Sequence, residues 1–539
     1  MPQFRARAAI ALGLAAGLVL AGCSATPGTD ADEASTAETV QTGGTYTHAF
    51  SAVGAITSLD PPTLIFHEAL QVVRALADSL VDQKPDGTIV PWIAESWEIN
   101  DDATVYTFHL REGGTFSDGA PIDAAAVKAN FDRAVALGPK AVGAYPLLLG
   151  LTETKVVDPR TVEFDFAKPA AYFLQAVSGA VFGLISPNDL GKDPADLAKG
   201  EYAGSGPFTL ASYNPQTEID LDKRVGYDTP SSIAEHTGDA YVDHLRLVEI
   251  GDASTRANQV ADGEIQSAAL IAFQDEARLS ATEGVTLLPL KIPGLTETLI
   301  INQKSFLGTD APAREAIQLA IDSKTIVSTV FGPSYGAGAS AIGSGTPGFA
   351  DQSGAIEYDP AKAERVLDDD GWTVGDDGIR TKDGTRFTVR VPAIGNWPGA
   401  ELLQAQLLKV GIDLPLDKSD QATSSAALAN GDYEADKWQM TRADVSVLNA
   451  VWNSNHTSQG YAWASPGPLD ELLDAQESAI DPGDRAAASA KVQQYLIENH
   501  WAIPLDDRAW TYAYNASAHG LRADGETKLV FYDVWVSQG

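Results

Sequence analysis

The sequence is poor in cysteine and in positive charge. Cys23 is the only cysteine among 539 residues, so no disulfide can form within the chain. Lysine and arginine number 37 against 73 aspartates and glutamates, which gives a formal net charge of −36. Because phosphate groups are bound mainly by lysine and arginine, this balance argues against nucleic-acid binding. It argues equally against adhesion to anionic lipid headgroups.

Long hydrophobic runs are also missing, apart from one near the start. Residues 8–20 are apolar and follow a short segment that contains Arg5 and Arg7. About 13 residues are too few for the ~20 that span a bilayer as a helix, and a basic stretch before a short apolar stretch is typical of a secretion signal. The run ends in Leu20-Ala21-Gly22-Cys23, which resembles the lipobox of bacterial lipoproteins.

The lipobox resemblance implies cleavage after residue 22 and lipidation of Cys23, which would attach the mature protein to the cell membrane. The alternative is an ordinary signal peptide in which Cys23 is incidental. Residues 24–44 are rich in small and acidic residues and contain no basic residue. We therefore expect a signal peptide over 1–22 and a flexible acidic tether over 23–44.

The rest of the chain is long enough for two or three domains. With 44% hydrophobic residues and ten tryptophans, it can form sizeable cores. Strand-like alternation over 104–110 and 162–166 is interleaved with helical patterns, which predicts an α/β fold. Aspartates that precede amphipathic stretches predict helix N-caps at Asp123, Asp310, Asp322 and Asp359.

Further along the chain, a strand–helix–strand pattern is expected. Residues 387–391 and 412–416 read as strands, and residues 398–410 between them read as a helix. Such an order indicates two parallel strands joined by a helix. The last long helix is expected over 484–499.

Motifs of the common metalloproteases and ATPases are missing. The sequence contains no His-Glu-x-x-His and no G-x-x-x-x-G-K. Gly343 to Gly348 fits G-x-G-x-x-G, but Pro347 stands where a phosphate-binding helix should begin, so we expect a loop. Among 73 acidic residues, spacing alone neither singles out nor excludes a catalytic carboxylate pair. No enzymatic activity, cofactor or metal is expected.

The segment 76–131 resembles the opening block of the large bacterial extracellular solute-binding proteins, family 5, the oligopeptide, dipeptide and nickel type. The similarity rests on Ser96-Trp97, on the strand end Phe108–Arg111 and on Phe116–Gly119. Further elements resemble the family in the right order and are Gly204–Phe208, Ala316–Asp322, Asp470–Leu473, Asp481, Arg485 and Ile503–Leu505. Each is weak by itself, but the ordered set spans about residues 45–510.

This resemblance implies an α/β fold of the type II periplasmic-binding-protein kind, in its large, cluster C form. Lobe I would comprise residues 45–292, with an extra subdomain at about 67–200, and lobe II residues 293–504. Residues 505–539 would return to lobe I. The chain would cross between lobes near 291–295 and 502–507. Ligand binding would close the lobes about this hinge, and a membrane permease would recognise the closed form.

The resemblance also suggests where the ligand binds. In peptide-binding members of the family, a Trp-x-x-Asp segment supplies strand-like backbone contacts and an acid for the ligand's α-amino group. The matching residues here are Trp438, Gln439, Met440, Thr441 and Arg442, with Asp444 beyond them.

At the acid position of this segment stands Thr441. A hydroxyl cannot neutralise a buried ammonium. Arg442, in contrast, can form a bidentate pair with a carboxylate. Either the acid role has moved, or the ligand lacks a free α-amino group. Aromatic candidates for stacking on the ligand are Trp397, Tyr461 and Trp463, although each could equally pack in a core. Asp60-Pro61 resembles the first cleft loop of the family, but a structural turn explains it equally well.

The sequence thus predicts the substrate-binding component of an ABC importer outside the cytoplasm. We expect it to be monomeric and to work with permease subunits and a separate ATPase, since it carries no ATP-binding motif. An oligopeptide is the default ligand. Alternatives are a metal chelate, an opine-like conjugate or an oligosaccharide. A surface receptor or sensor on the same scaffold is a further alternative, and a secreted hydrolase is disfavoured.

Overall fold

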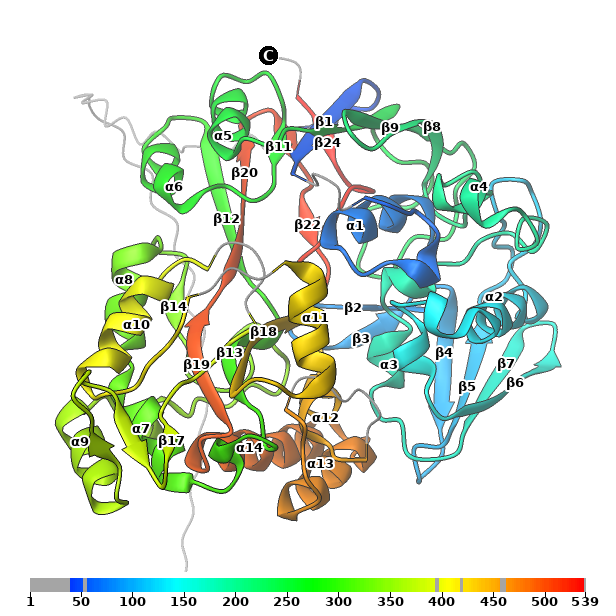
Figure 1. Cartoon of the computed structure of the whole chain (residues 1–539). Coiled ribbons are helices and arrows are strands. Elements are labelled where there is room, and N and C mark those ends of the chain that lie inside the picture. Colours follow the sequence, from blue (N-terminus) through cyan, green and yellow to red (C-terminus); the bar gives the residue numbers. More distant parts are fainter. Residues whose placement is uncertain (1–38, 52–55, 393–396, 417–419, 456–461, 538–539) are drawn as a thin grey trace, which may run out of the picture. The chain divides into compact units, whose positions relative to one another are not determined.

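The computed structural model describes residues 39–51, 56–392, 397–416, 420–455 and 462–537 (Figure 1). The predicted signal peptide, the lipidation site Cys23 and most of the predicted tether lie outside these ranges. Within them, no helix is both long and apolar enough to cross a membrane.

A seven-stranded sheet draws on three distant parts of the chain. Its strands are β1 (Thr45–Phe50), β8 (Phe208–Asn214), β9 (Glu218–Lys223), β10 (His244–Glu249), β11 (Ser267–Ala268), β12 (Val285–Lys291) and β20 (Ala509–Asn515). Their order is β12-β20-β11-β1-β10-β9-β8. Strand β1 pairs in parallel with β10 and β11, whereas the other neighbours are antiparallel. Helices α1 (His67–Leu76), α5 (Ala253–Ala261) and α6 (Phe273–Ser280) belong to the same region.

A separate four-stranded antiparallel sheet is formed between β1 and β8 in the sequence. It has the order β4-β5-β7-β6 and contains β4 (Ala94–Ile99), β5 (Val105–Leu110), β6 (Leu151–Asp158) and β7 (Thr161–Phe166). Helix α2 (Ala124–Leu137) begins where the Asp123 side chain accepts a hydrogen bond from the Ala126 N–H, at 2.8 Å. The hairpin of β2 (Val81–Gln83) and β3 (Ile89–Pro91) precedes this sheet.

Aromatic rings, most of them edge-to-face or tilted, fill the core of this second sheet. Phe173, in the short helix α3 (Phe173–Ala176), is fully buried. Its ring centroid lies 4.8 Å from that of Phe166 and 5.1 Å from those of Tyr106 and Phe164. Such arrangements bring the positive edge of one ring to the negative face of the next and stabilise the core beyond simple burial.

A third sheet, also four-stranded, has the order β14-β19-β13-β18. Its strands are β13 (Gly294–Ile301), β14 (Gly336–Ala337), β18 (Ala435–Thr441) and β19 (Ala502–Asp507). The helices of this region are α7 (Ala311–Ala320), α8 (Ser323–Val330), α9 (Pro360–Asp369), α10 (Ala400–Lys409), α11 (Gln421–Asn430), α12 (Val447–Trp452), α13 (Pro468–Ser478) and α14 (Pro482–Glu498). Apolar cores lie on both faces of the sheet, with Leu299 in one and Ile300 in the other.

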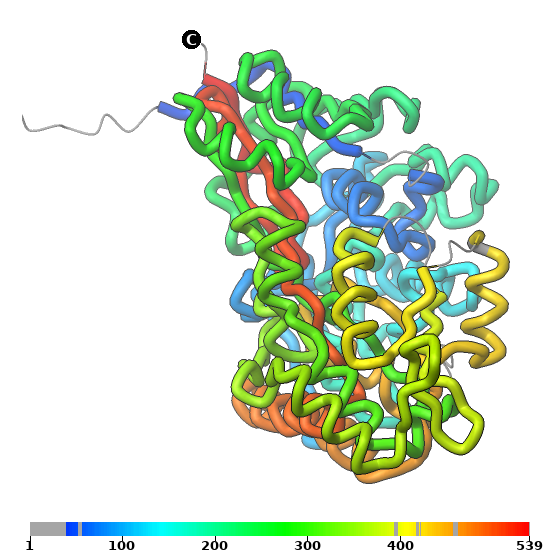
Figure 2. Tube along the Cα trace, turned by 60° about the vertical axis from the view of Figure 1, so that its left-hand side comes forward, coloured from blue at the N-terminus to red at the C-terminus, as the bar shows by residue number. Residues whose placement is uncertain are grey.

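The chain passes between the seven-stranded sheet and the third sheet twice. Strand β12 ends at Lys291 and β13 begins at Gly294. On the return, Arg508 is the single residue between β19 and β20. The red C-terminal strands run beside the green 285–301 segment in Figure 1 and again in the turned view of Figure 2.

Most of the expected elements are present. Strands β5 and β7 coincide with the alternating segments, and the final helix α14 covers nearly the predicted range. Each predicted aspartate cap accepts a backbone hydrogen bond at the start of its helix, namely Asp123, Asp310, Asp322 and Asp359. Residues 343–348 form a loop, as predicted.

The strand–helix–strand prediction was wrong in its strands. Helix α10 lies within the predicted range, but 387–391 and 412–416 form no regular strands and share one isolated parallel bridge, between Thr388 and Asp413. Phe387 and Ile412 are nevertheless fully buried. The apolar pattern therefore indicates that the side chains are buried, and here they are buried without a continuous series of strand hydrogen bonds.

Truncation of Phe173 tests the role of the aromatic core. Phe173→Ala should destabilise the protein by about 3–5 kcal/mol, because it removes a buried ring and leaves a cavity. Phe66→Ala, at a position 46% exposed, is the matched control and should change stability little. Differential scanning calorimetry of both variants makes the comparison. Equal shifts of the two melting temperatures would contradict the assignment of Phe173 to a tightly packed core.

Candidate functional site

Among the strands of the described residues, β18 is the last in its sheet, next to β13. Successive side chains point to opposite faces. Accordingly Ala435 packs in one apolar core and Met440 against the other. The side chain of Trp438 is 37% exposed, whereas those of Gln439 and Thr441 are half-buried. An exposed edge of this kind can pair with an extended ligand through the main chain.

A buried carboxylate, Glu297, ties β18 to the crossing between the sheets. Its side chain is 2% exposed, and its two oxygens contact Lys437 Nζ at 2.7 Å and Arg508 Nη2 at 3.0 Å. Arg508 Nε also donates to Asp506 Oδ1 at 2.9 Å. Trp397, a candidate from the sequence, lies beside this cluster, with Lys437 Nζ 5.6 Å from its ring centroid. That distance is within the range of a cation–π interaction.

A second buried acid, Asp436 on β18, lacks full hydrogen bonding. Asp436 is 2% exposed, and its Oδ2 has no hydrogen-bond partner among the residues that the structure describes. Burial raises the pKa of Asp436 to about 7, with nearby Lys437 opposing the shift and Glu297 adding to it. Burial likewise raises the pKa of Asp506 to about 6. Both groups titrate near neutral pH, in the same part of the fold.

The residues that follow β18 are fixed in place by an internal ion pair. Asp444 Oδ1 lies 2.7 Å from Arg485 Nη2, and the same carboxylate oxygen accepts the Ser446 N–H at 2.7 Å. Burial alone would raise the pKa of Asp444, but Arg485 and these hydrogen bonds hold it below its usual value. Arg485 also donates to the Gln476 carbonyl at 2.7 Å. The carboxylate of Asp444 therefore acts as an anchor for the segment.

Arg442, two residues before that anchor, borders a cavity of about 580 Å³. One wall is formed by residues 146–150 and 167–172, next to the β4-β5-β7-β6 sheet, and includes Leu147 and Tyr172. The opposite wall comes from Arg442, from residues 446–455 and from residues 474–478, and includes Asn453 and Glu477. Ligand sites typically have this size and combine apolar walls with a few polar groups.

The guanidinium of Arg442 is one candidate polar group of this cavity, which Lys168, Asp474 and Glu477 also line. Its side chain is half-buried and makes no side-chain hydrogen bond to another described residue, while its positive charge helps to lower the pKa of Glu526. A guanidinium offers a planar fork of donors that matches a carboxylate. A partly buried cation with free donors is therefore suited to bind an anionic group.

Trp463, another candidate from the sequence, lies elsewhere. Trp463 donates from its indole N–H to the Leu428 carbonyl at 3.1 Å and stacks under Lys304 Nζ, 3.0 Å from the ring centroid. It therefore packs on α11 and is not among the residues that line the cavity. Tyr461 lies outside the described residues.

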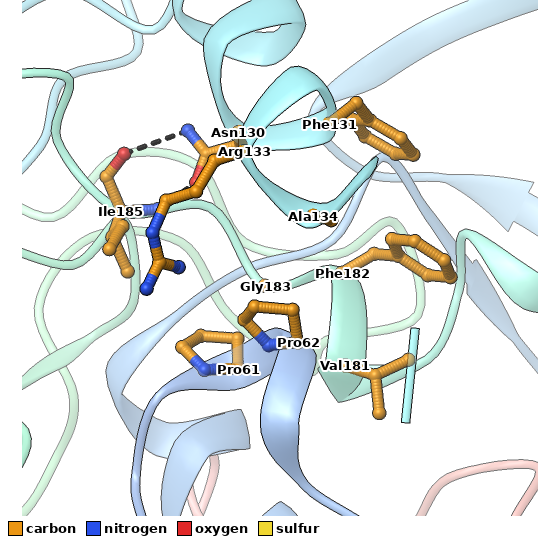
Figure 3. A pocket seen from close by; sticks show the side chains of 10 residues that line it. All are labelled: Pro61, Pro62, Asn130, Phe131, Arg133, Ala134, Val181, Phe182, Gly183 and Ile185. Atoms are coloured by element: carbon orange, nitrogen blue, oxygen red, sulfur yellow. Dashed lines mark hydrogen bonds between the residues drawn. The ribbon is translucent and has the colours of Figure 1, made fainter. Parts of the chain in front are cut away.

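Asp60, from the possible cleft loop, has a structural role. It is 2% exposed and forms a bidentate pair with Arg133 of α2, at 2.9 Å and 2.6 Å. Figure 3 shows Arg133 pointing toward the rings of Pro61 and Pro62, beside a pocket of about 10 Å³. A space of that size holds about one water molecule. In the structure this loop is held as a turn by the Asp60–Arg133 pair.

Residues 88–462 match the family described as bacterial extracellular solute-binding proteins, family 5. The chain belongs to this family. Among curated relatives, the glutathione-binding protein GsiB of Salmonella typhi is 26% identical over 502 residues, which cover 89% of this chain and 93% of the relative.

Solved structures show the same fold. The binding protein AgaA from A. tumefaciens R10, in complex with agropinic acid, has a TM-score of 0.74 at 23% identity and covers 92% of this chain and 99% of that chain. DppA from Helicobacter pylori, in complex with the peptide STSA, has a TM-score of 0.75 at 21% identity, with the same coverage. The chain therefore has the two-lobe α/β fold of type II periplasmic binding proteins. The family match and the curated relative identify it as an extracytoplasmic substrate-binding component of an ABC importer.

The buried state of Asp436 predicts a pH dependence of stability. In the folded protein this carboxyl keeps its proton up to about pH 7, whereas the unfolded chain releases it near the ordinary value. The stability that this group contributes is thus fully present below the ordinary value and is lost as the pH rises through about 7. Asp436→Asn, which cannot ionise, should melt at a higher temperature than the wild type at pH 8 and at nearly the same temperature at pH 4.

The control for this test is Asp101→Asn, at an exposed turn. Melting temperatures of all three proteins between pH 4 and pH 8 give the comparison. A difference between Asp436→Asn and the wild type that stays constant over this range would contradict a buried, protonated Asp436.

Proposed function

We propose that this solute-binding protein carries a short peptide or peptide-like solute whose carboxylate pairs with Arg442. The observation that supports this most is the free guanidinium of Arg442 at the edge of a 580 Å³ cavity. A charge-assisted pair in a partly buried site contributes more than a neutral hydrogen bond. The similarity to a glutathione-binding protein and to a peptide-bound neighbour supports the same class of ligand.

The edge of β18 supports a peptide as well. An extended peptide beside this edge would exchange main-chain hydrogen bonds with it, without depending on the peptide's side chains. Trp438, Gln439, Met440 and Thr441 would then contact the ligand mainly through their backbone. Trp397 would contribute an aromatic surface next to the Lys437–Glu297–Arg508 cluster.

An opine-like conjugate is the second candidate, because such a ligand also presents carboxylates to Arg442 and because the neighbour AgaA was solved with agropinic acid. An oligosaccharide is less well supported. Sugar rings are typically held by stacked aromatic side chains, and among the described residues that line the cavity Tyr172 is the single aromatic one.

We further propose that the protein acts without catalysis, as a monomer held to the membrane by a lipid on Cys23. It would deliver its ligand to permease subunits that work with a separate ATPase. We place lobe I at residues 45–292 and lobe II from residue 293. Because β19 still pairs within the third sheet, we place the return to lobe I at Arg508, slightly later than residue 505.

Replacement of Arg442 tests the carboxylate pair. Tri-alanine and its C-terminally amidated form should differ in affinity for the wild type by at least about tenfold, or about 1.4 kcal/mol. Arg442→Ala should weaken tri-alanine binding by a similar factor and remove the difference between the two ligands. Isothermal titration calorimetry measures all four combinations.

The matched control is Arg365→Ala on α9, whose side chain is 64% exposed. It should leave both affinities unchanged. If the wild type does not bind tri-alanine, or if Arg442→Ala binds it with unchanged affinity, the proposed pair is wrong.

Lipidation of Cys23 has its own test. Cys23→Ser removes the thiol that would carry the diacylglycerol, so the variant should move to the aqueous phase on detergent partitioning, and mass spectrometry should find no lipid adduct. The wild type should partition with the detergent. Continued partitioning of the variant into detergent would disprove the anchor.

A further inference from the structure

Gln83 joins three distant segments of the chain. It is the last residue of β2, and its side chain is 4% exposed. Its Nε2 donates to the Ala443 carbonyl at 3.0 Å, 360 positions along the chain. Its own carbonyl accepts the N–H of Gly525 at 3.1 Å. Gly525 lies in the turn between β22 (Arg522–Ala523) and β23 (Leu529–Val530).

The acceptor of the Gln83 side chain lies between two residues of the candidate site. Ala443 follows Arg442 directly and precedes Asp444. Asp444 is fixed by Arg485, and the Gln476 side chain donates to the Val445 carbonyl at 2.9 Å. These contacts hold the segment to α13 and α14, on the side of the third sheet. The hydrogen bond from Gln83 holds the same segment to the β2–β3 hairpin.

The hairpin itself is attached on the side of the seven-stranded sheet. The Asp78 N–H just before it donates to Ser205 Oγ at 2.7 Å, and Gly206, two residues before β8, donates to the Leu76 carbonyl at 2.9 Å. The side chain of Gln83 therefore links the β2–β3 hairpin, on the side of the seven-stranded sheet, to the segment that follows β18 of the third sheet. In a protein whose lobes close about a hinge, such a bond forms when the lobes are together.

A second contact of the hairpin supports this role. Gly87 in its turn has φ +90° and lies so close to Pro347 that an added Cβ would be 2.5 Å from the proline Cβ. Pro347 belongs to the glycine-rich loop 343–348. This loop in turn packs on the crossing between the sheets, since a Cβ on Gly345 would lie 2.3 Å from the Lys291 carbonyl oxygen. The hairpin thus touches both the Arg442 segment and a loop at the hinge.

The burial of the Gln83 amide does not favour the stability of the fold. Its Oε1 is buried without a hydrogen-bond partner among the described residues. A buried acceptor without a partner costs free energy, and a leucine or methionine of similar size would avoid that cost. The Nε2 group of the same amide explains why glutamine is present, because it holds the Ala443 carbonyl next to Arg442.

We propose that Gln83 is a positioning residue that latches the Arg442 segment when the lobes close on ligand. This inference rests on the proposed function, in which Arg442 pairs with the ligand's carboxylate. The latch does not touch the ligand. It fixes the backbone from which the Arg442 side chain extends, and so it slows the reopening that releases the ligand.

Gln83→Glu is the sharpest test, because it keeps the shape and removes the donor. Gln83→Met, which keeps the length without polar atoms, is the second variant. With tri-alanine as ligand in stopped-flow binding, both should raise the dissociation rate constant at least fivefold and leave the association rate constant within twofold. The ligand-free melting temperature should stay unchanged, because the bond forms in the closed state. Gln216→Ala, at an exposed turn, is the control and should change none of these values.

The outcomes separate the latch from the proposed function. If wild-type protein binds tri-alanine and the dissociation rate of Gln83→Glu is unchanged, the latch is wrong and the proposed function stands. If both variants lower the ligand-free and ligand-bound melting temperatures equally, Gln83 has only a structural role and the latch is also wrong. No binding of tri-alanine by the wild type would overturn the proposed function, and the latch with it.

Discussion

The buried carboxylate of Glu297 holds together the three strands that meet where the chain crosses between its sheets. It lies on β13. Its partner Lys437 comes from β18, and its partner Arg508 follows β19 directly. Moving three charges into a buried site costs desolvation, so such a cluster is a weak source of net stability. Removing only some of its side chains, however, would leave a buried charge without a compensating partner. The cluster therefore makes the relative position of β13, β18 and β19 hard to change.

This constraint extends to the candidate site. Because β18 is fixed at Lys437, its outer edge and the Arg442 segment beyond it have a defined position relative to the hinge. Asp444 and Arg485 then fix the far end of that segment. Arg442 thus extends from backbone that is held on both sides, and a ligand that pairs with it does not have to order a mobile loop. Binding energy can instead serve to bring the lobes together.

Local features of the fold could be predicted from the sequence with good accuracy. The helix caps were predicted correctly, at Asp123, Asp310, Asp322 and Asp359. An aspartate side chain reaches backbone groups only two or three residues away, so the local sequence is enough to predict a cap. Residues 387–391 and 412–416 were predicted wrongly for the complementary reason. Their apolar side chains are buried, but whether buried backbone forms a ladder depends on distant neighbours.

Contacts between distant parts of the chain also limited the prediction of the site. Arg442 was singled out because it stands beside a family position with a missing acid, yet its cavity is completed by residues 146–150 and 167–172. Nothing in either segment indicates that they meet. Likewise, the pairing of Asp60 with Arg133 and the packing of Trp463 on α11 join residues far apart in sequence. The interaction of Gln83 with Ala443, 360 residues away, is the extreme case.

The single-residue return at Arg508 has a mechanical consequence. One residue between two strands offers only two soft backbone torsions, and the side chain of this residue is itself tied to Glu297 and Asp506. The other crossing, between Lys291 and Gly294, contains Pro293, whose φ is restricted by its ring. Two such stiff links, side by side, act together as one hinge. They permit bending about one line through both links and resist sliding or twisting of one lobe against the other.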